Sequence, residues 1–132
     1  MDNKTLVKEA LEARKMAYTP YSNFAVGAAL LTKDGKIYRG CNIENASYTP
    51  TNCAERTAFF KAVSEGEREF AAIAVVGGPA GNPPVDFCYP CGVCRQVMAE
   101  FAKGDFKIIL GENDVFTLDE LLPYGFDKEK IK

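Results

Sequence analysis

Two cysteine motifs, far apart in the sequence, constrain the fold of this chain more than any other feature. The first is Cys53-Ala54-Glu55, and the second is Pro90-Cys91-Gly92-Val93-Cys94. The chain has no histidine, so a zinc site here must be built from thiolates and carboxylates. A Cys-x-x-Cys pair at the start of a helix binds one ion side by side, and a third thiolate leaves the fourth tetrahedral position open for water. An open position is typical of catalysis, so the fold is expected to bring the two motifs together.

The residues beside the first cysteine suggest the chemistry of such a site. Glu55 stands two residues after Cys53, where its carboxylate can move protons next to a metal-bound water. Arg56 follows and can offer a positive charge and hydrogen bonds to the thiolates. We therefore take Cys53, Cys91 and Cys94 as candidate zinc ligands, Glu55 as the candidate proton carrier and Arg56 as its charged neighbour.

Size and charge indicate one domain that acts on a small molecule. The chain has 132 residues, of which 47% are hydrophobic, enough for a single domain over residues 1–132 with its own core. A net charge of -2 argues against a partner as acidic as a nucleic acid. No apolar run suggests a signal peptide or a membrane span, so we expect a cytoplasmic protein. Its five cysteines are then expected to be reduced thiols and ligands.

Hydrophobic spacing predicts an α/β fold with a mixed sheet. Helices are expected from about Leu6 to Ala17, from Cys53 to Ser64 and from Cys91 to about Lys103. Strands are expected at residues 25–31, 37–41, 73–76, 107–110 and 115–117, with a long loop at 77–90. The first two strands form a hairpin, and the strand-helix-strand alternation beyond it implies parallel pairing. Both cysteine motifs are expected at helix N-termini.

Several features allow other interpretations. Asn52 and Glu55 also fit a helix cap with its capping-box glutamate, and Cys-x-x-Cys also occurs in redox pairs. Cys88 adds a fourth thiol, enough for a closed structural zinc site or an iron-sulfur cluster. Against this, the Tyr89-Pro90 step forces an extended backbone that should turn Cys88 away from the other thiols. Cys41 reads as a small, buried strand residue.

Polar residues at the end of the second strand suggest a binding pocket. Strand alternation puts Asn42 and Glu44 on one face, an arrangement suited to the hydroxyl groups of a sugar. A solvated strand end is the other interpretation of this pair. Phe24, at the start of the first strand, is either a core residue or faces a planar base.

Four segments in order resemble one known family. Residues 18–30, 40–48, 53–56 and 90–96 are similar to the small, homotetrameric, zinc-dependent cytidine deaminases of pyrimidine salvage. The resemblance implies a three-layer α/β/α sandwich with a mixed five-stranded sheet. It also implies hydrolytic deamination of cytidine and deoxycytidine to uridine and deoxyuridine, with release of ammonia. The partners implied are a free nucleoside and further copies of the chain, not a nucleic acid or a membrane.

The resemblance also implies roles for individual residues. Cys53, Cys91 and Cys94 would hold one Zn²⁺ per subunit, zinc hydroxide would attack C4 of the base, and Glu55 would shuttle the protons. Arg56 would bond the thiolates. The substrate residues implied are Phe24, Asn42, Glu44, Ala54, Tyr89 and Phe126, with Asn42 and Glu44 on the ribose. Tyr89 stands where the family usually has serine, which leaves the pocket shape near it open.

The chain's C-terminal part holds the last implied contact. Residues 121–126 are apolar and aromatic, and the sequence alone favours a tail packed on its own subunit. The resemblance instead implies that Phe126 reaches the active site of a neighbouring subunit and covers the base. Two other functions stay open: a zinc deaminase of another aminopyrimidine such as blasticidin S, and a structural four-cysteine zinc or iron-sulfur protein.

Overall fold

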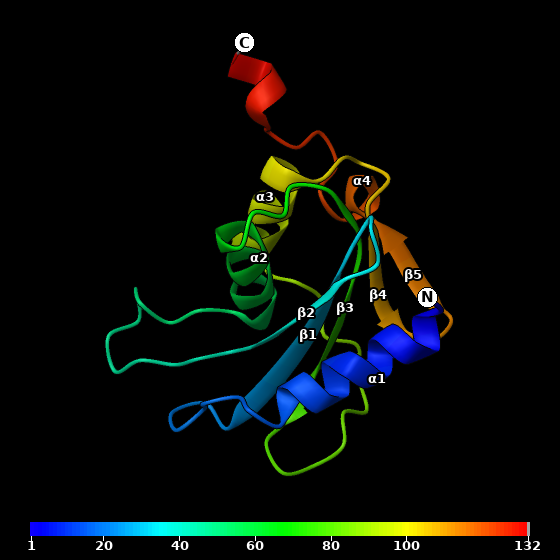
Figure 1. The fold of residues 1–132 in the computed structure, drawn as a ribbon. Helices are drawn as coiled ribbons and strands as arrows, with labels where there is room; N and C mark the ends of the chain where they lie inside the picture. The colour runs from blue at the N-terminus through cyan, green and yellow to red at the C-terminus, as the bar shows by residue number, and fades with distance from the viewer. Residues whose placement is uncertain (132) are drawn as a thin grey trace.

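The computed structural model, which describes residues 1–131, is a three-layer α/β/α sandwich (Figure 1). Its five-stranded sheet has the order β2-β1-β3-β4-β5. The strands are β1 (Phe24–Thr32), β2 (Ile37–Cys41), β3 (Phe70–Pro79), β4 (Lys107–Gly111) and β5 (Asp114–Thr117). The helices are α1 (Asn3–Arg14), α2 (Ala54–Ser64), α3 (Gly92–Phe101) and α4 (Leu118–Leu121), followed by a 3-10 helix at Lys128–Ile131.

The helices divide between the two faces of the sheet. Helix α1 lies across one face, and α2 and α3 cover the other (Figure 1). Because side chains alternate along a strand, each inner strand serves both layers: Ile73 packs in the core beneath α2 and α3, whereas Ala74 packs in the core beneath α1. This alternation confirms the predicted sandwich and its mixed five-stranded sheet.

The strand pairing corrects one expectation. Only β3 and β4 run parallel; β1 pairs antiparallel with both β2 and β3, and β4 pairs antiparallel with β5. The expected parallel pairing beyond the hairpin therefore holds only across the α3 crossover. Helix α2 joins β2 to β3, but these two strands do not pair, because β1 lies between them. A tight turn joins β4 to β5, which requires antiparallel strands.

The ends of several elements also differ from the expected ones. The expected strand at 73–76 extends to residues 70–79, so the first residues of the expected loop belong to β3. Gly77 and Gly78 pair with Val26 and Ala25 of β1, and these long-range partners override a composition that indicates a loop. Helix α1 ends at Arg14, earlier than expected. Within residues 1–131, none of the helices has the length and apolar character needed to cross a membrane.

One glycine sets the distance between α2 and the sheet. A Cβ atom on Gly40 of β2 would lie 2.3 Å from the Ala54 carbonyl oxygen and 2.5 Å from the Ala58 nitrogen. Such distances are far inside van der Waals contact, so only glycine lets the first turn of α2 lie this close to β2. That first turn carries the Cys-Ala-Glu motif.

Candidate functional site

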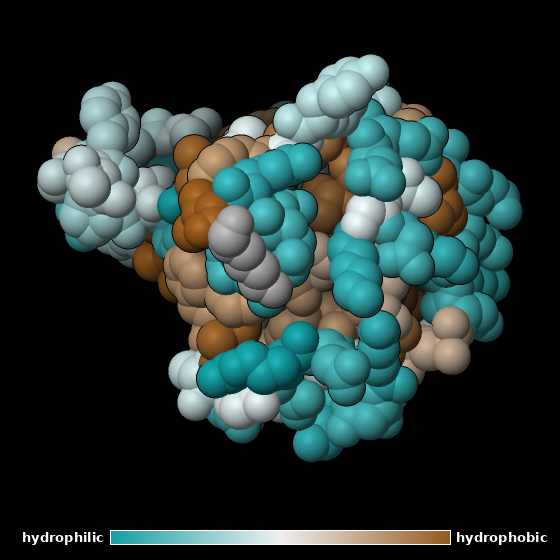
Figure 2. Space-filling view, turned by 90° about the horizontal axis from the view of Figure 1, so that it is seen from above, coloured by the Kyte–Doolittle hydropathy of each residue, from teal (hydrophilic) through white to brown (hydrophobic). Residues whose placement is uncertain are grey.

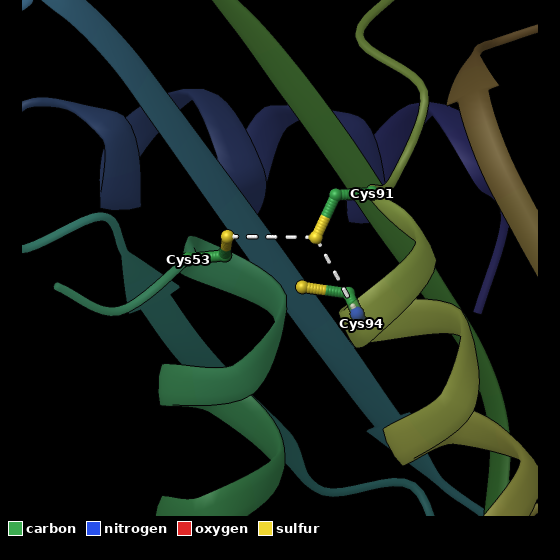
Figure 3. A group of neighbouring side chains, drawn as sticks. All are labelled: Cys53, Cys91 and Cys94. Atoms are coloured by element: carbon green, nitrogen blue, oxygen red, sulfur yellow. Dashed lines mark hydrogen bonds between the residues drawn. The ribbon is translucent and has the colours of Figure 1, made fainter. Parts of the chain in front are cut away.

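Three cysteine side chains from two helices point toward one another (Figure 3). Cys53 is the N-cap of α2, Cys91 is the N-cap of α3, and Cys94 lies in the first turn of α3. Their Sγ atoms all lie within 4.8 Å of one another, and those of Cys53 and Cys91 are 3.8 Å apart. The structure therefore places both motifs at helix N-termini and brings them together, as the spacing predicted.

The three sulfurs fit a zinc ion. Tetrahedral zinc with Zn–S bonds of about 2.3 Å holds its sulfurs about 3.8 Å apart, which matches the separation of Cys53 and Cys91. No fourth cysteine or acidic side chain of residues 1–131 joins the group. A three-thiolate set of this kind leaves one coordination position for water or substrate.

The surroundings of Cys53 favour the anionic form that binds metal, whereas the hydrogen bond to Cys53 raises the pKa of the Cys94 thiol. A hydrogen bond from the Cys94 thiol, together with Arg56, lowers the pKa of Cys53 to about 5. Arg56 Nη2 donates to Cys53 Sγ over 3.1 Å, and the Cys94 backbone N–H donates to Cys91 Sγ over 3.4 Å. The positive ends of the two helix dipoles add to this stabilisation of negative sulfur. Arg56 therefore lies where the sequence predicted it, against a ligand thiolate.

Glu55 lies buried beside the sulfurs. Glu55 is only 4% exposed. Burial raises the pKa of the Glu55 carboxyl to about 7; the Cys53 charge also raises it, and a hydrogen bond with Cys94 opposes the rise. A carboxyl group with this pKa exchanges protons readily near neutral pH. The arrangement thus supplies a proton carrier next to a candidate metal centre.

The capping interpretation of Glu55 is wrong. The N-cap of α2 is Cys53 and not Asn52, and no side chain caps this helix end by a hydrogen bond. Glu55 is then the second residue of the helix, not the third, which is the position that a capping box requires. Glu55 therefore does not cap the start of α2.

Cys88 lies apart from the cysteine group. A Cβ atom on Gly77 would be 2.7 Å from Cys88 Sγ, so this thiol packs on β3. Burial raises the pKa of Cys88 to about 11, which keeps the thiol neutral. The geometry therefore speaks against a four-thiolate site, and Cys41 on β2 is likewise outside the group.

The ring of Tyr89 lies toward β5, one of the two edge strands of the sheet. Its centroid is 5.8 Å from that of Phe116 on β5 and 6.2 Å from that of Phe87. Strand β5 is the edge strand on the opposite side of the sheet from β2. The Tyr89 ring, which is half exposed, thus contacts two aromatic neighbours.

Asn42 and Glu44 are joined to the start of β1 and to the metal-ligand helix. Asn42 Oδ1 accepts from the Val26 N–H over 2.9 Å, and the Glu44 carboxylate accepts from the backbone N–H groups of Tyr21 and Ser22. Between them, Ile43 exchanges two backbone hydrogen bonds with Asn52, the residue before Cys53. The candidate sugar residues, Phe24 and the cysteine group are therefore parts of one connected region.

Comparison with known proteins identifies the family. A family model described as the cytidine and deoxycytidylate deaminase zinc-binding region matches residues 1–110. The chain belongs to this deaminase family. Two similar relatives are the cytidine deaminases of Sporosarcina psychrophila and Halalkalibacterium halodurans. They are 54% and 56% identical, with 99% of this chain covered and 96% and 98% of theirs.

Solved structures agree with this membership. The crystal structure of cytidine deaminase from Burkholderia pseudomallei matches with a TM-score of 0.87 and 50% identity, over 96% of this chain and 100% of that one. A blasticidin-S deaminase from Bacillus cereus is also similar, at 33% identity over 93% of this chain and 91% of its own. As in the family, the cysteine group of this deaminase-family chain is a zinc site.

The C-terminal segment of this family member, residues 121–126, packs on its own body only at its start, where Leu121 and Leu122 contact the core beneath α2 and α3. Phe126 is 59% exposed, and Tyr124 is fully exposed with a positive φ of 55°. Figure 1 shows the chain leaving the sandwich beyond α4, and Figure 2, seen from that end, shows apolar surface among the hydrophilic side chains. Two hydrogen bonds tie the segment to α3: Arg95 Nη1 donates to the Leu121 carbonyl over 2.6 Å, and Gln96 Nε2 donates to the Phe126 carbonyl over 2.7 Å. The expectation of a tail packed on its own subunit therefore holds for Leu121 and Leu122 and not for Tyr124 and Phe126.

Sequence reasoning missed one residue of this region. The Ser22 hydroxyl donates to the Glu44 carboxylate and accepts from the Phe24 N–H. Serine in a polar loop is common, and only its position two residues before Phe24 pointed to this role.

Proposed function

We propose that this protein hydrolytically deaminates cytidine and deoxycytidine to uridine and deoxyuridine, with release of ammonia, in pyrimidine salvage. The observation that carries the proposal is the convergence of three thiols at two helix N-termini beside the buried Glu55. The relatives that are 54% and 56% identical over nearly the whole chain are named cytidine deaminases, which favours this substrate over blasticidin S.

The roles of the residues follow from their places. Zinc held by Cys53, Cys91 and Cys94 would supply the Lewis acidity that brings the pKa of water to about 7. The Glu55 carboxylate accepts a proton from the water that adds to C4 of the base. It gives this proton to N3, then takes the second proton from the C4 hydroxyl and passes it to the amine, which leaves as ammonia as the C4 carbonyl forms. Arg56 and the two helix N-termini offset the negative charge of the thiolates.

The pocket residues orient the nucleoside. We assign the base to the ring of Phe24 and the sugar hydroxyls to Asn42 and Glu44. Asn42 bonds the backbone of Phe24 and Val26, and Ile43 bridges to Asn52, the residue before Cys53. Ala54 directly follows Cys53, and Tyr89 stands two residues before Cys91; their backbone groups are assigned to the amine end of the base. The Tyr89 ring contacts Phe116, and the contact assigned to Tyr89 uses its backbone carbonyl.

The main experiment measures metal and substrate together. Purified protein is expected to hold one zinc per chain and to consume cytidine and deoxycytidine, followed by the loss of cytidine absorbance. Blasticidin S serves as the competing substrate. Faster turnover of blasticidin S than of cytidine would contradict the substrate assignment, and a brown chromophore in place of zinc would contradict the whole site.

The proposal includes a homotetramer in which Phe126 covers the base in a neighbouring subunit. Its support is the exposure of two aromatic side chains near the end of the chain, Tyr124, which is fully exposed, and Phe126, which is 59% exposed. Truncation after Pro123 should then raise KM strongly while zinc stays at one per chain, because the cut removes apolar cover and no ligand. An unchanged KM, with the tetramer intact on a sizing column, would remove Phe126 from the site.

The cellular location completes the proposal. All five cysteines are free thiols in the structure, and thiols stay reduced in the cytosol. A cytoplasmic enzyme acting on free nucleosides agrees with this chemistry.

A further inference from the structure

The backbone of Phe24 is held on both sides by side chains of the pocket. Its N–H donates to Ser22 Oγ over 3.1 Å, and its carbonyl accepts from Asn42 Nδ2 over 2.8 Å. Phe24 is the first residue of β1, and its partner across the sheet is Pro79. The Ala80 N–H donates to the Asn23 carbonyl, so Phe24 and Pro79 form a pair that exchanges no backbone hydrogen bonds, and pairing with β2 on the other side begins only at Gly27. At this position the side chains of Ser22 and Asn42 hydrogen-bond the backbone of Phe24.

Ser22 links Phe24 to Glu44. A serine hydroxyl has one hydrogen to donate, and here it goes to the Glu44 carboxylate. The oxygen lone pairs are then free to accept from Phe24. The hydrogen bond from Ser22 also lowers the pKa of Glu44, so the carboxylate remains an ionised acceptor at neutral pH. A continuous chain of hydrogen bonds therefore joins the carboxylate at the sugar end to the aromatic residue at the base end.

The surrounding loop is held by four further hydrogen bonds. Residues 19–23 belong to no helix or strand, and Asn23 has a φ of 54°. The Asn23 N–H donates to the Thr19 carbonyl, the Ala80 N–H donates to the Asn23 carbonyl, and the N–H groups of Tyr21 and Ser22 donate to Glu44. None of these bonds involves the N–H of Phe24. The hydroxyl of Ser22 is thus the group that fixes the N–H of Phe24.

We propose that Ser22 is a positioning residue for nucleoside binding, whose hydroxyl joins the sugar-facing Glu44 to the base-facing Phe24. The inference rests on the proposed function, which assigns the ends of the nucleoside to these two residues. Because one hydroxyl serves both, a sugar hydroxyl bound at Glu44 and a ring packed on Phe24 support each other. Loss of the hydroxyl should weaken binding without touching the groups that carry protons.

Kinetics of three variants test this assignment. Ser22→Ala should raise KM for cytidine about fivefold, the effect of one hydrogen bond, with kcat within about twofold of wild type and zinc at one per chain. Ser22→Thr keeps the hydroxyl and should restore KM. Ser64→Ala is the matched control, because it removes an exposed hydroxyl that bonds only the Lys61 carbonyl at the end of α2. An unchanged KM in Ser22→Ala, or a kcat that falls as far as KM rises, would overturn the proposal.

A double-variant cycle tests the coupling between the two ends. If Ser22 acts through Glu44, the change in KM caused by Glu44→Gln should be smaller in the Ser22→Ala background than in wild type. Equal changes in both backgrounds would show that the two residues act independently, and the link would fall.

Hydrogen exchange tests the link in protein without nucleoside. In Ser22→Ala the Phe24 amide should exchange about fivefold faster, because its acceptor is lost, while the Ala80 amide keeps its rate. Unchanged exchange at Phe24 would overturn the positioning role in an active enzyme. A wild-type protein that does not consume cytidine would instead overturn the proposed function, and with it the role of Ser22 in binding.

Discussion

Replacing Glu55 by glutamine isolates the proton carrier from the metal site. Glutamine has the size of glutamate, and Glu55 lies buried in the first turn of α2. The metal ligands are sulfurs of other residues. Glu55→Gln should therefore keep the fold and one zinc per chain, because it changes the charge and the titrating proton but not the packing.

The size of the expected loss follows from the number of proton transfers. One positioned acid or base is usually worth about 10²- to 10⁴-fold in rate. Here one carboxyl serves the water, N3 and the amine, so we expect a loss of kcat of at least about 10⁴-fold, or about 5.5 kcal/mol in barrier height. The pKa of about 7 that burial gives Glu55 suits proton transfer at neutral pH, and an amide has no equivalent.

The assay compares zinc content, thermal unfolding and cytidine consumption of the same preparations. Glu65→Gln is the matched control, because Glu65 is the exposed C-cap residue at the other end of α2. That control should retain wild-type activity. If Glu55→Gln kept its zinc and stayed within tenfold of wild-type activity, Glu55 would have no part in proton transfer.

Three further variants test the metal centre and the helix that carries it. Cys53→Ala should lose zinc and lower the melting temperature, because the metal ties α2 to α3; an equal zinc content by elemental analysis would exclude Cys53 as a ligand. Cys88→Ser should keep one zinc and most of the activity, since Cys88 packs on β3; zinc loss there would point to a fourth thiolate. Gly40→Ala should lower the free energy of unfolding in urea by about 1–3 kcal/mol, because its Cβ would meet Ala54; unchanged stability would show that α2 shifts without cost.

The sequence predicted the helix starts better than the extent of the strands. A cysteine at an N-cap begins a run of helical periodicity, so the positions of Cys53 and Cys91 could be read locally. The end of β3 could not, because its Gly77-Gly78-Pro79 composition indicates a loop. Only pairing with β1, about fifty residues earlier in the chain, makes it a strand.

In the candidate site, too, some residues could be predicted from the sequence and others could not. Residue types and spacing predicted the zinc ligands and Glu55, since few other arrangements of cysteine and glutamate serve an open metal site. The bond from Ser22 to Glu44 spans 22 positions, and no local pattern marks it. The exposure of Phe126 was implied only by the family resemblance, because an apolar segment in a single chain by itself suggests burial on that chain.

One junction in the fold fixes the metal end and the sugar end of the site together. Gly40, near the end of β2, lets the first turn of α2 lie against the strand. Just beyond it, the backbone of Ile43 pairs with Asn52, next to Cys53. The strand that leads to Asn42 and Glu44 is thus bonded to the segment that presents the first zinc ligand. If the proposed roles hold, a shift of α2 would move the candidate zinc ligand Cys53 together with the strand end that carries the proposed sugar residues.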